Sequence, residues 1–107
     1  MENCIFCKIA NGEIKSDFLY ENEDFFVIKD LHPKAKTHLL LIPKKHVKDL
    51  NEFDAEKYGT KLISAIQNAT KKLGIESYKI QINTGKDAGQ EVFHLHIHIL
   101  SNSELNN

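Results

Sequence analysis

Segment 92–100 holds the densest set of chemically active side chains in the sequence, with His94, His96 and His98 alternating with aliphatic residues. This period of two predicts a strand, in which successive side chains point to opposite faces of the sheet. The three imidazoles then share one face, about 6.5–7 Å apart, because a strand rises ~3.3 Å per residue. The aliphatic face suits packing on a helix, whereas the histidine face must meet water, a ligand or a metal.

Three interpretations of the histidine face remain open from the pattern alone. The rings are simply exposed, or two or three of them hold zinc, as His-x-His pairs do in metal-dependent hydrolases. The third interpretation is nucleophilic and acid–base catalysis, for which imidazole is suited because it titrates near neutrality.

The loop Asn83–Glu91 precedes this segment and carries Gly85 and Gly89 among polar residues. Glycines allow close backbone approach, and successive amide groups can cradle an anion. A β-hairpin connection explains the loop equally well, so the loop alone identifies no phosphate site. Directly beside a row of histidines it is a candidate phosphate pocket, and this placement favours catalysis.

Cys4 and Cys7 form a C-x-x-C pair at the start of the sequence. In a chain of cytosolic type, such a pair indicates zinc or redox chemistry before a structural disulfide. A thioredoxin-like site requires a preceding strand and a βαβ unit, and neither is predicted. Two buried free cysteines remain the alternative.

The composition excludes several classes of protein. The 107 residues include 41% hydrophobic and 27% charged residues with a formal charge of −1, which argues against a disordered chain and against electrostatic binding of nucleic acid. All 14 basic residues are lysine, and the pair Lys44-Lys45 is too small for a nucleic-acid patch. No apolar run approaches the ~20 residues of a membrane span, and the first residues lack a signal-peptide pattern. We therefore expect a cytoplasmic protein with no membrane or nucleic-acid partner.

The elements that must position these residues can be predicted in outline. A short helix over Ile5–Asn11 ends at Gly12, and a longer helix begins after Asp54 and ends near Leu73. The long helix has an apolar stripe at spacings of three and four residues. The predicted strands are Phe18–Tyr20, Phe25–Lys29, His38–Ile42 (ended by Pro43), Tyr78–Ile82 and Val92–Leu100.

Short connections between most strands favour a mainly antiparallel sheet, and thus the α+β class. We expect five strands, one long helix and one short N-terminal helix in a single domain over residues 1–107. The last residues, about 101–107, read as a flexible tail.

Three stretches in the same order resemble the histidine triad (HIT) superfamily of nucleotide hydrolases and transferases. They are CIFCKIANGEI, KDLHPKAKTHLLLIPKKH and NTGKDAGQEVFHLHIHIL, and the last contains the His-φ-His-φ-His-φ-φ signature. The similarity is to the Hint-like branch in its short bacterial form with an N-terminal C-x-x-C zinc site. It implies the HIT-like fold and a homodimer.

The resemblance implies roles for three histidines. His96 matches the middle histidine of the signature, which attacks the α-phosphorus and forms a covalent nucleotidyl-histidine that water then hydrolyses. His98 matches the histidine that holds the α-phosphate oxygens and stabilises developing charge. His38 matches an upstream histidine of the active-site hydrogen-bond network.

The resemblance also implies a nucleoside pocket. Asp30 matches the acid that accepts hydrogen bonds from both ribose hydroxyls. The positions that match the apolar walls around the base are Ile5, Phe6, Ile9, Ile28 and Leu31. The positions that match the phosphate and leaving-group side are Asn83, Gly89, Glu91 and Val92.

A structural Zn²⁺ is implied by the match to bacterial members of the family. Its four ligands are Cys4, Cys7, His46 and His94, a closed set that leaves no coordination position vacant. No organic cofactor is expected.

The implied activity is that of a nucleotide phosphoramidase or nucleotidyl hydrolase that releases AMP or GMP from P–N linked substrates, such as an adenylated amine. The alternatives are a Fhit-like dinucleoside polyphosphate hydrolase, or a nucleotide-binding regulator or scaffold with vestigial activity. Glu91 departs from the pattern, since phosphoramidase-type relatives usually carry serine there. A carboxylate can assist an amine leaving group or repel a polyphosphate. The short segment after the last strand also differs from relatives whose C-terminal segment shapes specificity.

Overall fold

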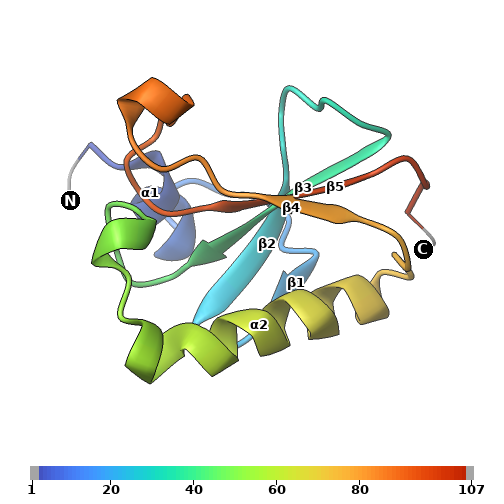
Figure 1. The fold of residues 1–107 in the computed structure, drawn as a ribbon, viewed down its shortest axis with the longest axis horizontal. Coiled ribbons are helices and arrows are strands. Elements are labelled where there is room, and N and C mark those ends of the chain that lie inside the picture. Colours follow the sequence, from blue (N-terminus) through green and yellow to red (C-terminus); the bar gives the residue numbers. More distant parts are fainter. Residues whose placement is uncertain (1–2, 106–107) are drawn as a thin grey trace.

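A computed structural model describes residues 3–105, which form one antiparallel sheet of five strands in the order β1-β2-β3-β5-β4 (Figure 1). The helices are α1 (Ile5–Ala10) and α2 (Ala55–Lys72), with 3-10 turns η1 (Leu50–Glu52) and η2 (Lys86–Ala88). The strands are β1 (Tyr20–Glu21), β2 (Phe25–Lys29), β3 (Thr37–Pro43), β4 (Lys79–Gln81) and β5 (Ile97–Ser101). The predicted α+β class, with five strands, one long helix and one short helix, is confirmed.

Both faces of the central strands are covered, and every residue of β3 is buried. Leu39 and Leu41 belong to the core between the sheet and α2, whereas Leu40 and Ile42 belong to a second core beneath α1. This division follows from the alternation of side chains along a strand. It explains why β3 is a continuous apolar run in the sequence.

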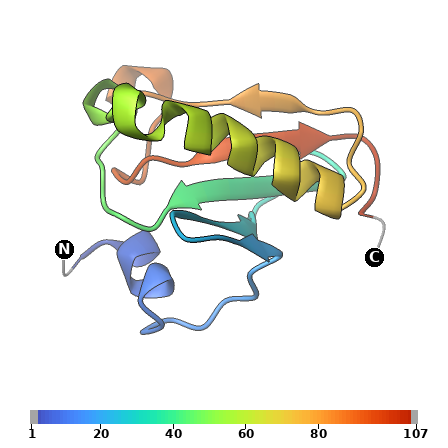
Figure 2. The ribbon, with the colours of Figure 1, turned by 90° about the horizontal axis from the view of Figure 1, so that it is seen from below.

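Helix α2 lies across one face of the sheet (Figure 2). It begins after Asp54, whose side chain accepts a hydrogen bond of 3.1 Å from the backbone N–H of Lys57. It ends before Gly74, which adopts a φ of 72° that favours glycine. Both helix limits agree with the sequence prediction. No helix within residues 3–105 is long and apolar enough to cross a membrane.

The last strand begins later than the sequence pattern predicts. The expected start at Val92 is wrong, because β5 begins at Ile97, opposite Leu41 of β3. Continuing the ladder would place Leu95 opposite Pro43, which has no N–H to donate. The N–H of Leu95 instead donates to the carbonyl of Val47 over 2.8 Å. The segment before β5 therefore leaves the sheet while keeping its alternating side chains.

The end of the described chain is packed against the rest of the molecule. Ser101 belongs to β5, and the hydroxyl of Thr37 donates to the carbonyl of Ser103 over 2.6 Å. Leu105 contacts the core beneath α2. These contacts involve residues of the segment 101–107 that we expected to be a flexible tail, and residues 106–107 lie outside the described part.

Candidate active site and metal site

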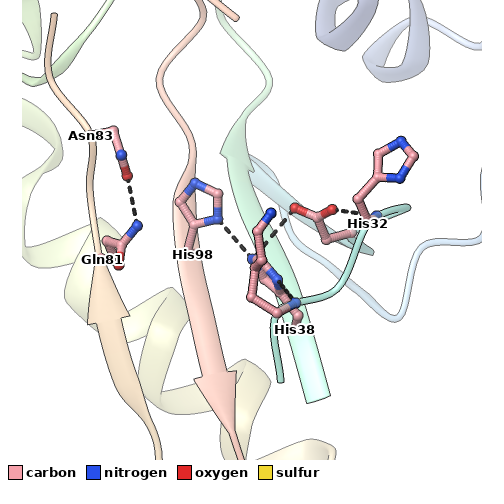
Figure 3. Close-up of polar contacts among 7 residues, drawn as sticks. His32, His38, Gln81, Asn83 and His98 are labelled. Atoms are coloured by element: carbon pink, nitrogen blue, oxygen red, sulfur yellow. Dashed lines mark hydrogen bonds and ion pairs between the residues drawn. The ribbon is translucent and has the colours of Figure 1, made fainter. Parts of the chain in front are cut away.

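The face of the sheet opposite α2 is only partly covered by α1, and its open part forms the floor of a cleft of about 780 Å³. His98 of β5 lies between Leu40 of β3 and Gln81 of β4, and His38 of β3 lies opposite Leu100 of β5. Figure 3 shows the His98 ring flanked by Gln81 on one side and His38 on the other. The antiparallel pairing therefore brings two histidines 60 residues apart into contact.

Hydrogen bonds fix the protonation of His38 and His98. The N–H of Lys34 donates to Nδ1 of His38 over 3.0 Å, so the proton of neutral His38 lies on Nε2. That Nε2 lies 2.8 Å from Nδ1 of His98 and 3.4 Å from Oδ2 of Asp30. His38 thus donates to Nδ1 of His98, and the proton of His98 lies on its own Nε2. His98 consequently offers an N–H donor from Nε2, to which no group within residues 3–105 is hydrogen-bonded.

His96 has the opposite tautomer. Its Nδ1 lies 2.8 Å from the backbone oxygen of His94. A carbonyl oxygen only accepts, so Nδ1 carries the proton and Nε2 carries a lone pair. The edge-on ring of Phe6, with its centroid 5.2 Å away, restricts the His96 ring, which is half-buried and lines the cleft. A nucleophilic nitrogen is therefore oriented by backbone and packing together.

Burial lowers the pKa of His98 from its ordinary value of 6.5 to about 4. Desolvation is the main cause, and the neighbouring His96 and His38 lower the pKa further, while Asp30 opposes them. His98 is therefore neutral near pH 7 and acts as a hydrogen-bond donor without carrying a full charge.

The glycine-containing loop is held against this site by a buried glutamine. The Oε1 of Gln90 accepts from the N–H of Gly85 over 2.8 Å, and its Nε2 donates to the carbonyls of Lys48 and Val92. Gly89 has a φ of 89°, and a Cβ there would lie 3.2 Å from Nδ2 of Asn83. The loop is thus a fixed wall of the cleft.

The structure separates the expected nucleotide-binding residues into three groups. Six line the cleft: Phe6, Asp30, Asn83, Gly89, Glu91 and Val92. Ile9 and Ile28 are buried behind Phe6 in the core beneath α1. Ile5 and Leu31 do not line the cleft, and Leu31 is 86% exposed.

Three further residues contribute to the cleft and were missed from the sequence. Lys34 orients His38 through its backbone, Gln81 faces the cleft beside His98, and Gln90 anchors the loop. Only Gln81 had a usable signal, because alternation in the predicted strand 78–82 places it on the face opposite Ile80. The other two roles depend on backbone contacts that no spacing reveals.

The four expected metal ligands converge at the end of α1. The Sγ atoms of Cys4 and Cys7 and the Nδ1 atoms of His46 and His94 all lie within 4.8 Å of one another. The two Nδ1 atoms are 3.2 Å apart, and three S···N distances are 3.2, 3.3 and 3.5 Å. Three segments distant in sequence, at Cys4–Cys7, His46 and His94, are thereby joined at one point.

This donor set fits a tetrahedral zinc ion. Zn–N bonds of about 2.05 Å and Zn–S bonds of about 2.3 Å require ligand separations of roughly 3.3–3.8 Å, close to those observed. Nε2 of His94 lies 2.8 Å from the carbonyl oxygen of Pro43 and donates to it, which leaves the lone pair on Nδ1 directed at the cluster. With the proton of His94 on Nε2, its Nδ1 lone pair and the nearby Nδ1 of His46, 3.2 Å away, are placed so that both could bind one cation.

Burial also shapes the titration of this cluster. It lowers the pKa of His94 to about 4, and it raises the pKa of Cys7 to about 11 together with the adjacent Cys4. A neutral imidazole is the form that binds metal, whereas the thiol must lose its proton on binding. Metal binding is thus coupled to proton release from the cysteines.

A second group of possible ligands, Asp30, His38 and His98, also lies close together. Its two ring nitrogens are only 2.8 Å apart, which is a hydrogen-bond distance, and the N–H of Lys34 already orients His38 to donate. The geometry therefore supports a hydrogen bond from His38 to His98 at this group of residues, with a proton between the two rings.

Comparison with known proteins identifies the family. The HIT domain matches residues 11–105 of this chain. The chain belongs to the HIT family. Protein HitA of Neisseria gonorrhoeae is 46% identical over 103 residues, covering 94% of this chain and 96% of its own length.

Two solved HIT structures are similar to this fold. A HIT family hydrolase from Legionella pneumophila has a TM-score of 0.81 and 39% identity, with 95% of each chain covered. A zinc-bound histidine triad family protein from Mycobacterium smegmatis has a TM-score of 0.79 and 34% identity, covering 95% of this chain and 76% of its own. The relatives of this HIT chain thus include a hydrolase and a zinc-bound protein.

Proposed function

We propose that this HIT protein is a nucleotidyl hydrolase that releases AMP or GMP from P–N linked substrates through a covalent intermediate on His96. The observation that carries the proposal is the opposite protonation of His96 and His98, which stand side by side with ring centroids 5.0 Å apart. One ring offers a lone pair to phosphorus, and its neighbour offers an N–H to a phosphate oxygen. Similarity to a HIT family hydrolase supports the same reaction class.

In the first step, the Nε2 lone pair of His96 forms a bond to the α-phosphorus while the P–N bond to the amine breaks. The departing nitrogen keeps the bonding electron pair and takes up a proton as it leaves. The Nδ1–H bond to the carbonyl of His94 stabilises the positive charge that develops on the ring. In the second step, a water oxygen forms a bond to phosphorus and gives up a proton to solvent. The N–P bond breaks, its electron pair returns to Nε2 of His96, and the nucleoside monophosphate leaves.

His98 stabilises the negative charge of the phosphate oxygens in both steps. Its low pKa keeps it neutral, so it donates a hydrogen bond without protonating the phosphate. His38 is the positioning residue, because its donation to Nδ1 of His98 holds the donor tautomer in place.

The nucleoside is proposed to lie on the Asp30 side of His98. Oδ1 of Asp30 accepts a hydrogen bond of 2.7 Å from the backbone N–H of His32, which fixes the carboxylate in the wall of the cleft. Figure 3 draws this bond as the dashed line that ends at His32. An ionised carboxylate only accepts hydrogen bonds and therefore suits ribose hydroxyls. Phe6 and Val92 supply apolar surface for the purine base.

The metal site is proposed to hold Zn²⁺ through Cys4, Cys7, His46 and His94. With four protein ligands and no vacancy, the ion would be structural and would connect α1 to the segment that carries His96. This connection matters for catalysis because the carbonyl of His94 is the acceptor that orients His96.

We also propose a homodimer. Strand β4 is one of the two edge strands of the sheet, all three of its residues are exposed, and Ile80 is 40% exposed there. Ile80 pairs with Ile99, which belongs to the core between the sheet and α2, and Ile63 of α2 is 55% exposed. Edge pairing with a second copy would cover both features, and sedimentation of the purified protein measures it.

The test is AMP release from adenosine 5′-phosphoramidate by the wild type and by His96→Ala. Loss of the nucleophile should lower the rate at least about a thousandfold, as for other nucleophiles that act within a catalytic unit. Melting temperature, zinc content and AMP binding serve as controls and should stay close to wild type. Equal low rates would contradict the proposal. Faster hydrolysis of diadenosine polyphosphates would instead favour the polyphosphate hydrolase, and nucleotide binding without turnover would favour a regulatory protein.

A further inference from the structure

Glu91 presents a free carboxylate to the active-site cleft. Its side chain is exposed and lines the cleft together with Asn83 and Gly89. Within residues 3–105, no lysine or hydrogen-bond donor is paired with this carboxylate, whereas Asp30, the other acid of the cleft, accepts from His32 and lies near His38. The charge of Glu91 is therefore available to a ligand.

The position of Glu91 is fixed although its side chain is free. The preceding Gln90 is 4% exposed and bonds to Gly85, Lys48 and the carbonyl of Val92, so the backbone is anchored on both sides of Glu91. A charge on a rigid wall discriminates between ligands better than a charge on a mobile loop.

Gln81 and Asn83 lie beside His98, on the side away from His38, and Asn83 bonds to the loop that carries Glu91. Nε2 of Gln81 donates to Oδ1 of Asn83 over 3.0 Å, and Nδ2 of Asn83 donates to the carbonyl of Ala88 over 2.8 Å. Figure 3 shows this pair on the opposite side of His98 from His38. A nucleoside over Asp30 therefore directs the group bonded to phosphorus towards Gln81, Asn83 and Glu91.

The cleft is also divided by charge. Lys79 precedes Gln81 by two residues in β4, at the end of the strand away from the loop, and lies opposite Leu100. Lys34 lies near His38. The end formed by the loop holds Glu91 and no lysine among the residues that line the described cleft. The two ends thus differ in the sign of the charge they present to a substrate.

We infer that Gln81, Asn83 and Glu91 form a leaving-group subsite that selects amines carrying a second, protonated group. The inference rests on the proposed function and names the substrate class of the same site. The carboxylate of Glu91 attracts the distal ammonium, and the same charge repels a polyphosphate leaving group. The chemical step is unchanged: Nε2 of His96 forms a bond to phosphorus and gains the nucleotidyl group, the P–N bond breaks, and the amine leaves with the bonding electron pair and takes up a proton from solvent.

Two substrates of matched shape test the inference. Both are AMP amidates, one made with ethylenediamine, whose free end is protonated, and one with propylamine, whose free end is a methyl group. For the wild type, the ratio of kcat/KM for the charged over the uncharged substrate should exceed that of Glu91→Gln by about two- to fivefold, the range of exposed ion pairs. The inductive effect of the ammonium cancels in this comparison. High salt should reduce the difference by screening.

Two variants complete the design. Glu13→Gln removes an exposed carboxylate near the end of α1, outside the cleft, and should keep the wild-type ratio. If Glu91→Gln keeps the wild-type ratio of kcat/KM for the charged over the uncharged amidate, the inference is overturned. If that ratio also rises in Lys79→Gln, the leaving group lies at the end of the cleft that holds Lys79. Failure of the proposed function looks different, because neither amidate would then be hydrolysed by the wild type in a manner that depends on His96.

Discussion

His94 and His98 lie four residues apart in one segment but face opposite environments. The ring of His94 is fully buried among Cys4, Cys7 and His46, whereas the half-buried ring of His98 faces an open cleft. In His94 the nitrogen left free is Nδ1, because Nε2 donates to Pro43. In His98 the free nitrogen is Nε2, because Nδ1 accepts from His38.

The difference shows that the hydrogen-bond partner of one ring nitrogen decides what the other can do. A lone pair directed at two sulfur atoms suits a structural metal. An N–H directed at a cleft suits a phosphate oxygen. The two clusters are joined through His94, since its side chain belongs to the metal site and its carbonyl orients His96. We expect changes in the first cluster to affect stability most, and changes in the second to affect catalysis most.

The largest effect on stability should come from removing the metal. Chelation, or replacement of Cys4 and Cys7 by serine, should lower the free energy of unfolding by several kcal/mol, because zinc contributes on the order of 10 kcal/mol to zinc-finger peptides. Thermal denaturation with and without chelator measures the change. His96→Ala is the matched control and should keep its zinc and its melting temperature. A melting temperature that does not change with chelator would contradict a stabilising metal ion at this cluster.

An intermediate effect is expected from His38→Ala. Without its donor, His98 is free to place its proton on Nδ1, and kcat should fall about ten- to a hundredfold, as for other groups that orient a catalytic side chain. Nitrogen NMR of the imidazoles provides a direct readout, with the wild type showing an Nε2-protonated His98 and an Nδ1-protonated His96. Retention of the His98 tautomer in the variant would show that His38 does not set it.

The smallest expected effect is the contribution of His98 to the pH dependence of stability. Because the pKa of His98 is lowered from 6.5 to about 4 in the folded protein, the unfolded chain binds more protons between these values. The stability that this group contributes is therefore present above about pH 6.5 and is lost as the pH falls towards 4. His96, His38, Asp30 and Lys34 are the charged or titratable groups that act on it. Denaturant unfolding of the wild type and His98→Gln measures the difference, and the variant should show a flatter pH dependence. Parallel curves would contradict the assigned cause.

Much of the fold follows from local sequence patterns. The limits of α2 were predictable because Asp54 and Gly74 supply its end signals, and β3 was predictable because a strand covered on both faces is a continuous apolar run. The start of β5 was not predictable from alternation, because His94 and His96 already alternate with apolar residues in the segment that precedes the strand pairing. That boundary is set by the neighbouring strand β3, because Pro43 has no backbone N–H to donate to a longer ladder.

The sequence by itself determined that the histidines alternate with apolar residues and therefore present imidazoles away from the helix-covered core. It also determined the types of the four possible metal ligands, since these positions match a family pattern. Only the tertiary structure decided which ring nitrogen of His94, His96 and His98 is free, that Leu31 does not line the cleft, and that Gln81 lies beside His98. The physical reason is that alternation is a property of the local backbone, whereas tautomers and cleft walls depend on carbonyl groups and strands brought together from distant parts of the chain.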